Sequence, residues 1–174
     1  RIVISSNGSM PELTQKMIGE MPDVGVGISV DGIGAIHDRI RGVKGAYDKA
    51  LDTINRLIKL GVDDLGILLT ITDGNIDQVE AVYDLSCRLG VNFGCTVAHN
   101  SAICFNKNDN QLRNREAAIR QLEGIVDNLL STWNPKNWFR GYFCSGLINY
   151  INGKARMIKC GAAESLFFLD PYGN

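Results

Sequence analysis

The sequence predicts an α/β fold in which strands and helices alternate along the chain. Short apolar runs recur through its first hundred residues, and segments of helical periodicity separate them. Glycine or asparagine turn signals lie between each apolar run and the neighbouring helical segment. Repeated βα units of this kind favour a parallel sheet with right-handed crossover connections. Successive positions in the runs are apolar, which is typical of strands that are covered on both faces.

Four strands and three helices are predicted before residue 100. The helix over residues 47–58 is the clearest, because apolar residues recur every three or four positions and Gly61 follows as a stop signal. The strands are expected at residues 2–6, 24–30, 65–71 and 91–97, and the other helices at residues 11–21 and 76–89. The strand over residues 2–6 is expected at an edge of the sheet, where unpaired backbone groups favour pairing with a second copy.

The pattern becomes helical after residue 100. An amphipathic helix is predicted over residues 112–130 and a second helix, rich in aromatic residues, over residues 137–151. Two short extended runs follow at residues 157–160 and 166–169. The closing Asp-Pro-Tyr-Gly-Asn is a turn signal of a hairpin whose second strand lies outside the sequence. Because the sequence also begins within a strand, we expect it to be part of a longer protein.

Composition excludes several classes of function. The chain of 174 residues carries 18 Lys and Arg against 19 Asp and Glu, so binding to a nucleic-acid backbone is not expected. No apolar run approaches the roughly 20 residues that cross a bilayer, and no signal peptide is recognised. Five dispersed cysteines favour a reducing, cytoplasmic location. Four of them are expected to be buried apolar residues, namely Cys87, Cys95, Cys104 and Cys144.

Polar residues follow each predicted strand. They are Ser-Asn-Gly at residues 6–8, Ser-Val-Asp-Gly at 29–32, Thr-Asp at 72–73 and His-Asn at 99–100. Parallel α/β sheets bind ligands beyond the carboxyl ends of their strands, so this edge is the predicted ligand site. The alternative interpretation is that Thr72, Asp73 and Asn100 only cap helices and form turns.

Several of these segments resemble the radical S-adenosylmethionine (radical SAM) enzymes. Residues 29–32, followed by Ile-His-Asp-Arg-Ile-Arg-Gly at 36–42, are similar to the fourth strand and following loop of that family. Ile-Ser-Ser-Asn-Gly at 4–8 resembles its third strand, and Thr-Ile-Asn-Arg-Leu at 53–57 resembles one of its helices. The resemblance implies that residues 1–99 form the later half of a partial (β/α)6 TIM-like barrel.

The end of the sequence resembles the entrance of the SPASM extension, which follows the barrel in many such enzymes. Its pattern is a cysteine, about a dozen residues and a glycine, which Cys160 and Gly173 match. The resemblance implies that Cys160 is a ligand of an auxiliary iron–sulfur cluster. It also implies a helical connector over residues 100–156 and the truncated start of a SPASM hairpin over residues 157–174.

The resemblance implies a cofactor site at the predicted sheet edge. Ser29 would contact the ribose of S-adenosylmethionine, and Arg41 would bind its carboxylate or ribose region, with Arg39 as the competing candidate. A backbone contact to adenine would fall near Val97. Asp31 is expected to brace the loop rather than to touch the ligand.

The resemblance further implies reductive cleavage of S-adenosylmethionine by a [4Fe–4S] cluster. The resulting 5′-deoxyadenosyl radical would abstract hydrogen from a peptide or small-molecule substrate, and a reductant protein would be a partner. The family's CxxxCxxC cluster motif is absent from these residues, so the chain alone is expected to be inactive and to bind neither cofactor. Two alternatives stay open, a catalytically empty α/β binding or scaffold domain and a (β/α)-barrel enzyme that acts on a phosphorylated metabolite.

Overall fold

A four-stranded parallel sheet forms the centre of the fold in a computed structural model of the chain, which describes residues 2–21, 23–99, 112–155 and 157. The strands pair in sequential order, which confirms the predicted α/β class and topology. They are β1 (Val3–Ser6), β2 (Gly25–Ser29), β3 (Leu65–Ile71) and β4 (Asn92–Val97). As predicted, β1 lies at an edge of this sheet.

Helices follow the strands along the chain, and the bounds of those that the sequence predicts fall within a few residues of the predicted ones. They are α1 (Pro11–Gly19), α3 (Ala46–Leu60), α4 (Val79–Leu89) with a preceding 3-10 turn η1 (Ile76–Gln78), α5 (Arg115–Leu130) and α6 (Pro135–Ile151). One further helix, α2 (Ala35–Arg41), lies in the segment that the resemblance describes as a loop. Its seven residues are too few to show a helical period in the sequence.

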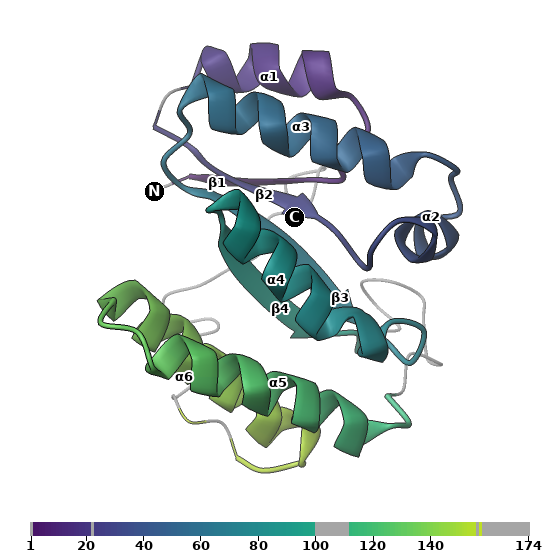
Figure 1. Cartoon of the computed structure of the whole chain (residues 1–174), viewed down its shortest axis with the longest axis vertical. Coiled ribbons are helices and arrows are strands. Elements are labelled where there is room, and N and C mark those ends of the chain that lie inside the picture. Colours follow the sequence, from purple (N-terminus) through teal and green to yellow (C-terminus); the bar gives the residue numbers. More distant parts are fainter. Residues whose placement is uncertain (1, 22, 100–111, 156, 158–174) are drawn as a thin grey trace, which may run out of the picture.

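One face of the sheet forms the core. Alternate residues of β2 and β3 point to this face, including Val26, Ile28, Ile67 and Leu69, and all four are buried. In Figure 1, α1 and α3 lie side by side over the first strands and α4 lies over β3 and β4. The helices follow their strands in sequence, as βα units require.

The opposite face of β2, β3 and β4 carries small and polar residues, with Leu68 as the exception. Register places Gly27 beside Gly66, Leu68 between Ser29 and Gly94, and Thr70 beside Thr96. A Cβ atom added at Gly27 would collide with the side chain of Leu68, and the nearest neighbour of one at Gly94 would also be Leu68. Helices of the described part of the chain cover only the other face. The prediction that the strands are covered on both faces is therefore confirmed for the face that the helices cover, and for the opposite face it stays a prediction.

Helices α5 and α6 pack against each other, and α6 also contacts the edge strand β4. Cys144 of α6 is buried, and Cys95 of β4 is half-buried near it. A hydrogen bond with Cys144, together with burial, raises the pKa of the Cys95 thiol. Cys87 is exposed on α4, because Tyr83 and Ser86 occupy the buried side of that helix, so the prediction for Cys87 was wrong. Cys104 and Cys160 lie outside the described residues.

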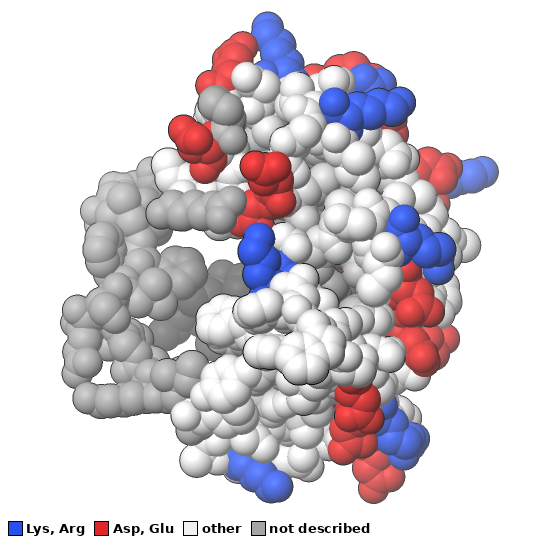
Figure 2. Space-filling model, turned by 60° about the vertical axis from the view of Figure 1, so that its left-hand side comes forward, with Lys and Arg blue, Asp and Glu red and all other residues white. Residues whose placement is uncertain are grey.

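Charged side chains of both signs are interspersed on the face drawn in Figure 2, and neither sign forms a continuous patch there. This distribution agrees with the formal net charge of −1. Within the described ranges, no helix is both long enough and apolar enough to cross a membrane.

Candidate functional site

Ser29 is the last residue of β2, at the carboxyl edge of the sheet. Its side chain is half-buried on the face that the helices leave open, beside Leu68 of β3. Among the described residues, nothing is hydrogen-bonded to the Ser29 hydroxyl. The hydroxyl can therefore donate to and accept from a ligand at this edge.

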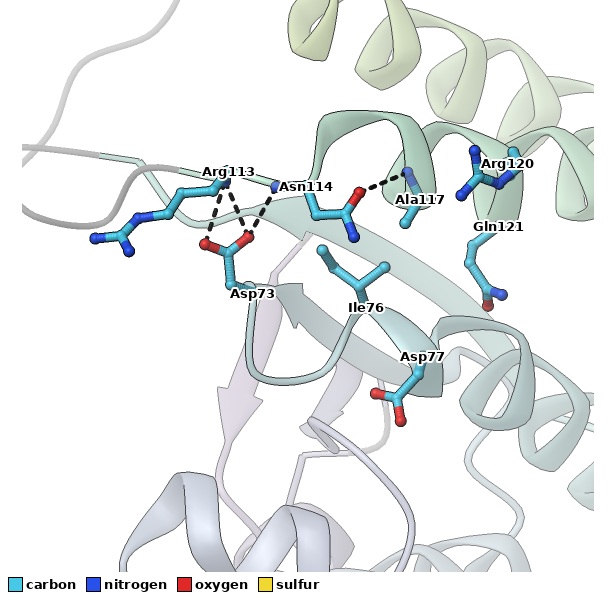
Figure 3. Close-up of a pocket in the computed structure, with 8 residues that line it drawn as sticks. All are labelled: Asp73, Ile76, Asp77, Arg113, Asn114, Ala117, Arg120 and Gln121. Carbon is cyan, nitrogen blue, oxygen red and sulfur yellow. Dashed lines mark hydrogen bonds between the residues drawn. The ribbon is translucent and has the colours of Figure 1, made fainter.

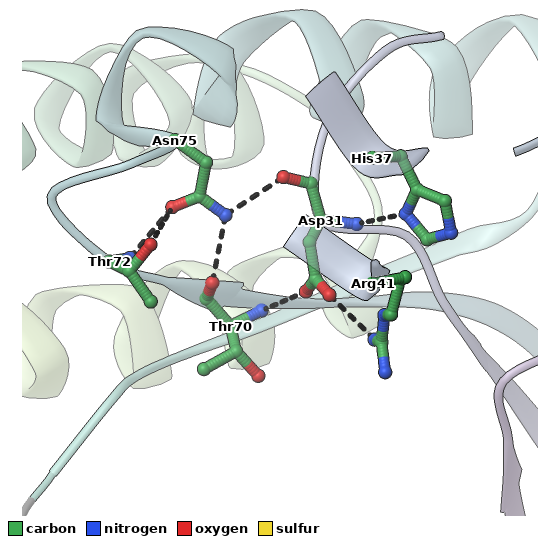
Figure 4. Close-up of polar contacts among 6 residues, drawn as sticks. All are labelled: Asp31, His37, Arg41, Thr70, Thr72 and Asn75. Carbon is green, nitrogen blue, oxygen red and sulfur yellow. Dashed lines mark hydrogen bonds and ion pairs between the residues drawn. The ribbon is translucent and has the colours of Figure 1, made fainter. Parts of the chain in front are cut away.

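Asp31 is the centre of a polar network just beyond β2 (Figure 4). Its side chain is almost fully buried, and one carboxylate oxygen, Oδ1, accepts the backbone N–H of Thr70 at 3.1 Å. The other, Oδ2, lies 2.6 Å from the guanidinium of Arg41. The backbone carbonyl of Asp31 accepts from Asn75 at 2.8 Å, and its backbone N–H donates to Nδ1 of His37 at 3.0 Å. The structure therefore shows Asp31 in the bracing role that the sequence predicts.

Arg41 ends α2 and leads from the buried network toward solvent. About a third of its side chain is exposed, and only one of its nitrogens is bound to Asp31, so the planar guanidinium has further donors with which to bind a ligand. Arg39, the competing candidate, is exposed and makes only a long contact of 3.4 Å to the carbonyl oxygen of Gly74. Arg41 is thus the arginine that the fold ties to the end of β2.

Asn75 is a buried residue for which the sequence analysis predicts no role. Its amide nitrogen donates to the carbonyl oxygens of Asp31 and Thr70, at 2.8 and 2.9 Å. Its oxygen accepts from the backbone N–H and the hydroxyl of Thr72, at 2.7 and 3.1 Å. Asn75 therefore joins the ends of β2 and β3. Its partner Asp31 is 44 positions away, and no local pattern reveals such a contact.

His37 is buried within α2 and holds that helix to the strand end. Only 1% of the residue is exposed, and its Nε2 atom has no hydrogen-bond partner within the part of the chain that the structure describes. Burial, and then the positive charge of Arg41, lower the pKa of His37 below its usual 6.5, against the opposing effect of Asp31 and Asp38. The neutral imidazole is therefore the form that the fold favours.

The pKa of His37 predicts how stability depends on pH. Above pH 6.5 His37 is neutral in both states, but between its lowered folded pKa and 6.5 the unfolded chain binds the additional proton. The free energy of unfolding should therefore fall as pH decreases from about 7.5 to about 5.5, and the fall should be steeper than in His37→Asn. Urea denaturation at both pH values measures this difference. An equal dependence of the free energy of unfolding on pH in the two proteins would contradict the prediction. The other histidine, His99, is present in both proteins, so its contribution is the same in each.

Asp38, in the middle of α2, joins this helix to the start of α3. Its carboxylate accepts the backbone N–H groups of Tyr47 at 2.8 Å and Gly45 at 2.6 Å, at the start of α3. These hydrogen bonds hold the pKa of Asp38 below its usual value. His37 thus binds the residues before α2, and Asp38 binds the residues after it. These contacts on both sides fix the position of a helix of only seven residues.

The remaining predicted residues lie apart from this network or outside the described part. Val97 is buried at the end of β4, opposite Ile71, where Ala98 donates to the Ile71 carbonyl at 2.9 Å. It thus shares the carboxyl edge with Ser29, with β3 between their strands. Cys160 and Asn100 fall outside the described residues. Thr72 donates to Asn75 and accepts the N–H of Gly74, which confirms the turn interpretation for Thr72.

A hollow of about 400 Å³ lies between the loop after β3 and the start of α5 (Figure 3). Asp73 on one side accepts the backbone N–H groups of Arg113 at 2.9 Å and Asn114 at 3.2 Å. The side chain of Asn114 in turn caps α5 at Ala117. Asp73 therefore holds the backbone that leads into α5, whose N-cap is Asn114, and the capping interpretation of Asp73 is not confirmed. Among the described residues, no group of three or more His, Cys, Asp or Glu is placed to hold a metal ion.

Comparison with known proteins finds relatives of this chain, although no family model matches it. The mycofactocin maturase MftC of Mycolicibacterium smegmatis is 33% identical over 176 residues, which cover 99% of this chain and 43% of the relative. The Fe-coproporphyrin III synthase of Methanosarcina barkeri is 36% identical over 88 residues, 49% of this chain and 21% of the relative. The sporulation killing factor maturation protein SkfB of Bacillus subtilis is 29% identical over 75 residues, 43% of this chain and 18% of the relative.

A solved structure of anSMEcpe with bound AdoMet has the same fold. It superposes with a TM-score of 0.58 at 19% identity and covers 91% of this chain and 44% of that one. The sheet is therefore part of a TIM-like α/β fold. The chain belongs to the radical SAM family, and the relatives it matches are SPASM-type maturases and synthases. It spans less than half the length of each relative and structure described here.

Proposed function

We propose that the protein containing this chain is a radical SAM oxidoreductase that binds S-adenosylmethionine and a [4Fe–4S] cluster. The observation that carries the proposal is the carboxyl edge of β2, where the strand ends at the Ser29 hydroxyl and Asp31, two residues on, binds the Arg41 guanidinium. When bound, the cofactors would supply a 5′-deoxyadenosyl radical for hydrogen abstraction from substrate. The chain would contribute binding and orientation.

The donors at this edge suit S-adenosylmethionine. The Ser29 hydroxyl both donates and accepts, as a ribose diol requires. The Arg41 guanidinium would form charge-assisted hydrogen bonds with a carboxylate, while Asp31 keeps it from turning away. The backbone near Val97, two strands away at the same edge, would meet the adenine.

The remaining assignments follow the family and stay proposals. Residues 1–99 would be the barrel part, residues 100–156 the helical connector and residues 157–174 the start of the SPASM domain. Cys160 would bind an auxiliary cluster together with thiolates from beyond this sequence. The substrate would be a peptide or a small molecule, and the names of the relatives, a maturation protein, a maturase and a synthase, support this range. A reductant protein would supply electrons in the cytoplasm, and pairing of copies would use the edge strand β1.

Alanine at either cofactor residue should weaken S-adenosylmethionine binding in the whole protein. Ser29→Ala and Arg41→Ala each remove one polar or ionic contact, worth roughly 0.5–3 kcal/mol, so the dissociation constant should rise about 2- to 150-fold. Equilibrium dialysis under anaerobic conditions measures it. Arg39→Ala is the matched control and should leave affinity unchanged. Unaltered affinity in both variants would remove these residues from the cofactor site.

Anaerobic reconstitution of the whole protein tests the proposed function itself. Iron and sulfide counting, followed by measurement of 5′-deoxyadenosine after reduction, should show cluster-dependent cleavage of S-adenosylmethionine. A protein that binds neither iron nor S-adenosylmethionine would instead be the catalytically empty binding domain. A CxxxCxxC motif in the sequence that precedes this chain in the whole protein would favour the enzyme.

A further inference from the structure

Two residues of α2 bind the same aspartate. His37 and Arg41 are four positions apart, so both lie on one side of the helix, one turn from each other. His37 contacts the backbone N–H of Asp31, and Arg41 contacts its carboxylate. The helix is therefore attached to the end of β2 at two points through one residue, as Figure 4 shows.

The backbone of Asp31 depends on His37 for a hydrogen-bond acceptor. Pairing with β3 ends one residue earlier, where the N–H of Val30 donates to Leu68 at 2.9 Å. Asp31 lies beyond that point and is 4% exposed, so water does not reach its N–H readily. An unpaired buried donor of this kind is unfavourable, because it loses its hydrogen bond to water and gains none in the protein. Nδ1 of His37 is the acceptor that removes this cost.

An imidazole at this buried position also has a disadvantage. The Nε2 atom has no partner among the described residues, while the ring packs edge-on to Tyr47 with centroids 6.1 Å apart. A leucine would fill similar space without an orphan polar atom, but it would offer Asp31 nothing to bind. The chemistry thus indicates that the acceptor at Nδ1 is the reason for a histidine here.

We propose that His37 is a positioning residue of the candidate cofactor site, which fixes the Asp31 carboxylate and thereby aims the Arg41 guanidinium. It acts through Asp31 and does not touch the ligand. The inference rests on the proposed function in one respect, which is that Arg41 binds S-adenosylmethionine. The link from His37 to Arg41 is a property of the chain itself and can be measured without any cofactor.

The positioning requires one protonation state of His37. Nδ1 must be unprotonated to accept, so the proton of the neutral ring is on Nε2. A second proton would place two N–H groups against each other and would break the bond to Asp31. The charged groups facing the ring act in different directions, since Arg41 opposes this proton while Asp31 and Asp38 favour it.

The first test measures the reactivity of Arg41 with phenylglyoxal, read by peptide mass spectrometry on the whole protein without cofactor. His37→Leu removes the acceptor and keeps the bulk, so Arg41 should be modified about tenfold faster, as expected for loss of about one hydrogen bond. His37→Asn should restore protection to within about threefold, because its amide oxygen takes the place of Nδ1. Arg39, exposed on the same helix, is the internal control and should not change.

The outcomes are distinct. If Arg41 reacts equally in the parent protein and in His37→Leu, the inference is overturned. If His37→Leu also speeds the modification of Arg39, the leucine variant has disturbed the helix as a whole, and His37→Asn becomes the deciding variant. The inference is then overturned if, in His37→Asn, Arg39 reacts at its parent rate while Arg41 still reacts as fast as in His37→Leu.

The second test measures the dissociation constant of S-adenosylmethionine under anaerobic conditions in the same three proteins. It should rise about tenfold in His37→Leu and return to within about threefold in His37→Asn. A parent protein without affinity for S-adenosylmethionine, but with the expected Arg41 reactivities, would overturn the proposed function and leave the positioning role supported. Normal affinity in His37→Leu would overturn the role of His37 in the cofactor site.

Discussion

Replacing Asn75 by alanine should lower the free energy of unfolding by about 3 kcal/mol, since buried polar groups that lose their partners cost about 1–3 kcal/mol each. The substitution removes both donors to the carbonyls of Asp31 and Thr70 and the acceptor for Thr72. All of these groups lie where two strand ends meet. Urea denaturation of the variant and the parent protein measures the loss.

Two further variants separate the Asn75 hydrogen bonds from other effects. Asn55→Ala changes an exposed asparagine on α3 and should alter stability by no more than about 0.5 kcal/mol. Asn75→Asp keeps the shape but sets a carboxylate oxygen against two carbonyl oxygens, so it should destabilise at least as much as alanine. If Asn75→Ala were as mild as Asn55→Ala, the network would not be a significant source of stability.

Gly8→Ala is expected to cost about 3 kcal/mol, because backbone strain and overpacking act together. Gly8 has a φ of +68°, in the left-handed region that favours glycine. A Cβ atom there would lie 2.9 Å from the Cα atom of Ala50, in the backbone of α3, which cannot rotate aside. The loop would have to move, although its carbonyl is bound by the Thr53 hydroxyl at 2.8 Å.

Gly61→Ala is the matched control for Gly8. Gly61 has a φ of +80°, but no atom lies within 4 Å of its added Cβ atom, so only the backbone term applies. Its cost should be about 1 kcal/mol. The difference between the two variants, measured by thermal or chemical denaturation, isolates the contact with α3. Equal losses in both would show that the close approach of Gly8 to Ala50 is not important for stability.

Local periodicity was sufficient to predict most of the fold. The apolar spacing of α3 and its Gly61 stop, and the unbroken run of β3, are signals carried by neighbouring residues. Helix α2 was missed because hydrogen bonds to other parts of the chain stabilise it. His37 accepts from the backbone of Asp31, and Asp38 accepts from the backbone at the start of α3. A helix held in this way needs no long amphipathic pattern.

The candidate site was predictable only in part. Ser29 and Arg41 were identified by resemblance, and Asp31 was correctly expected to brace the loop. Asn75 was not identified, since its partner Asp31 is 44 residues away. Each of the two residues follows a strand, where asparagine and aspartate are common, so neither position shows that they bind each other. Residues that connect two strand ends depend on the folded topology, which sequence patterns do not encode locally.

The contact between Gly27 and Leu68 has a consequence for how this chain can change during evolution. The two residues lie on adjacent strands, and any side chain at position 27 would occupy space that Leu68 already fills. Enlargement at position 27 is therefore accessible only after position 68 has become smaller, whereas the reverse order passes through an overpacked intermediate. Substitutions at these two sites are expected to be accepted in one historical order, as a pair that conserves their summed volume.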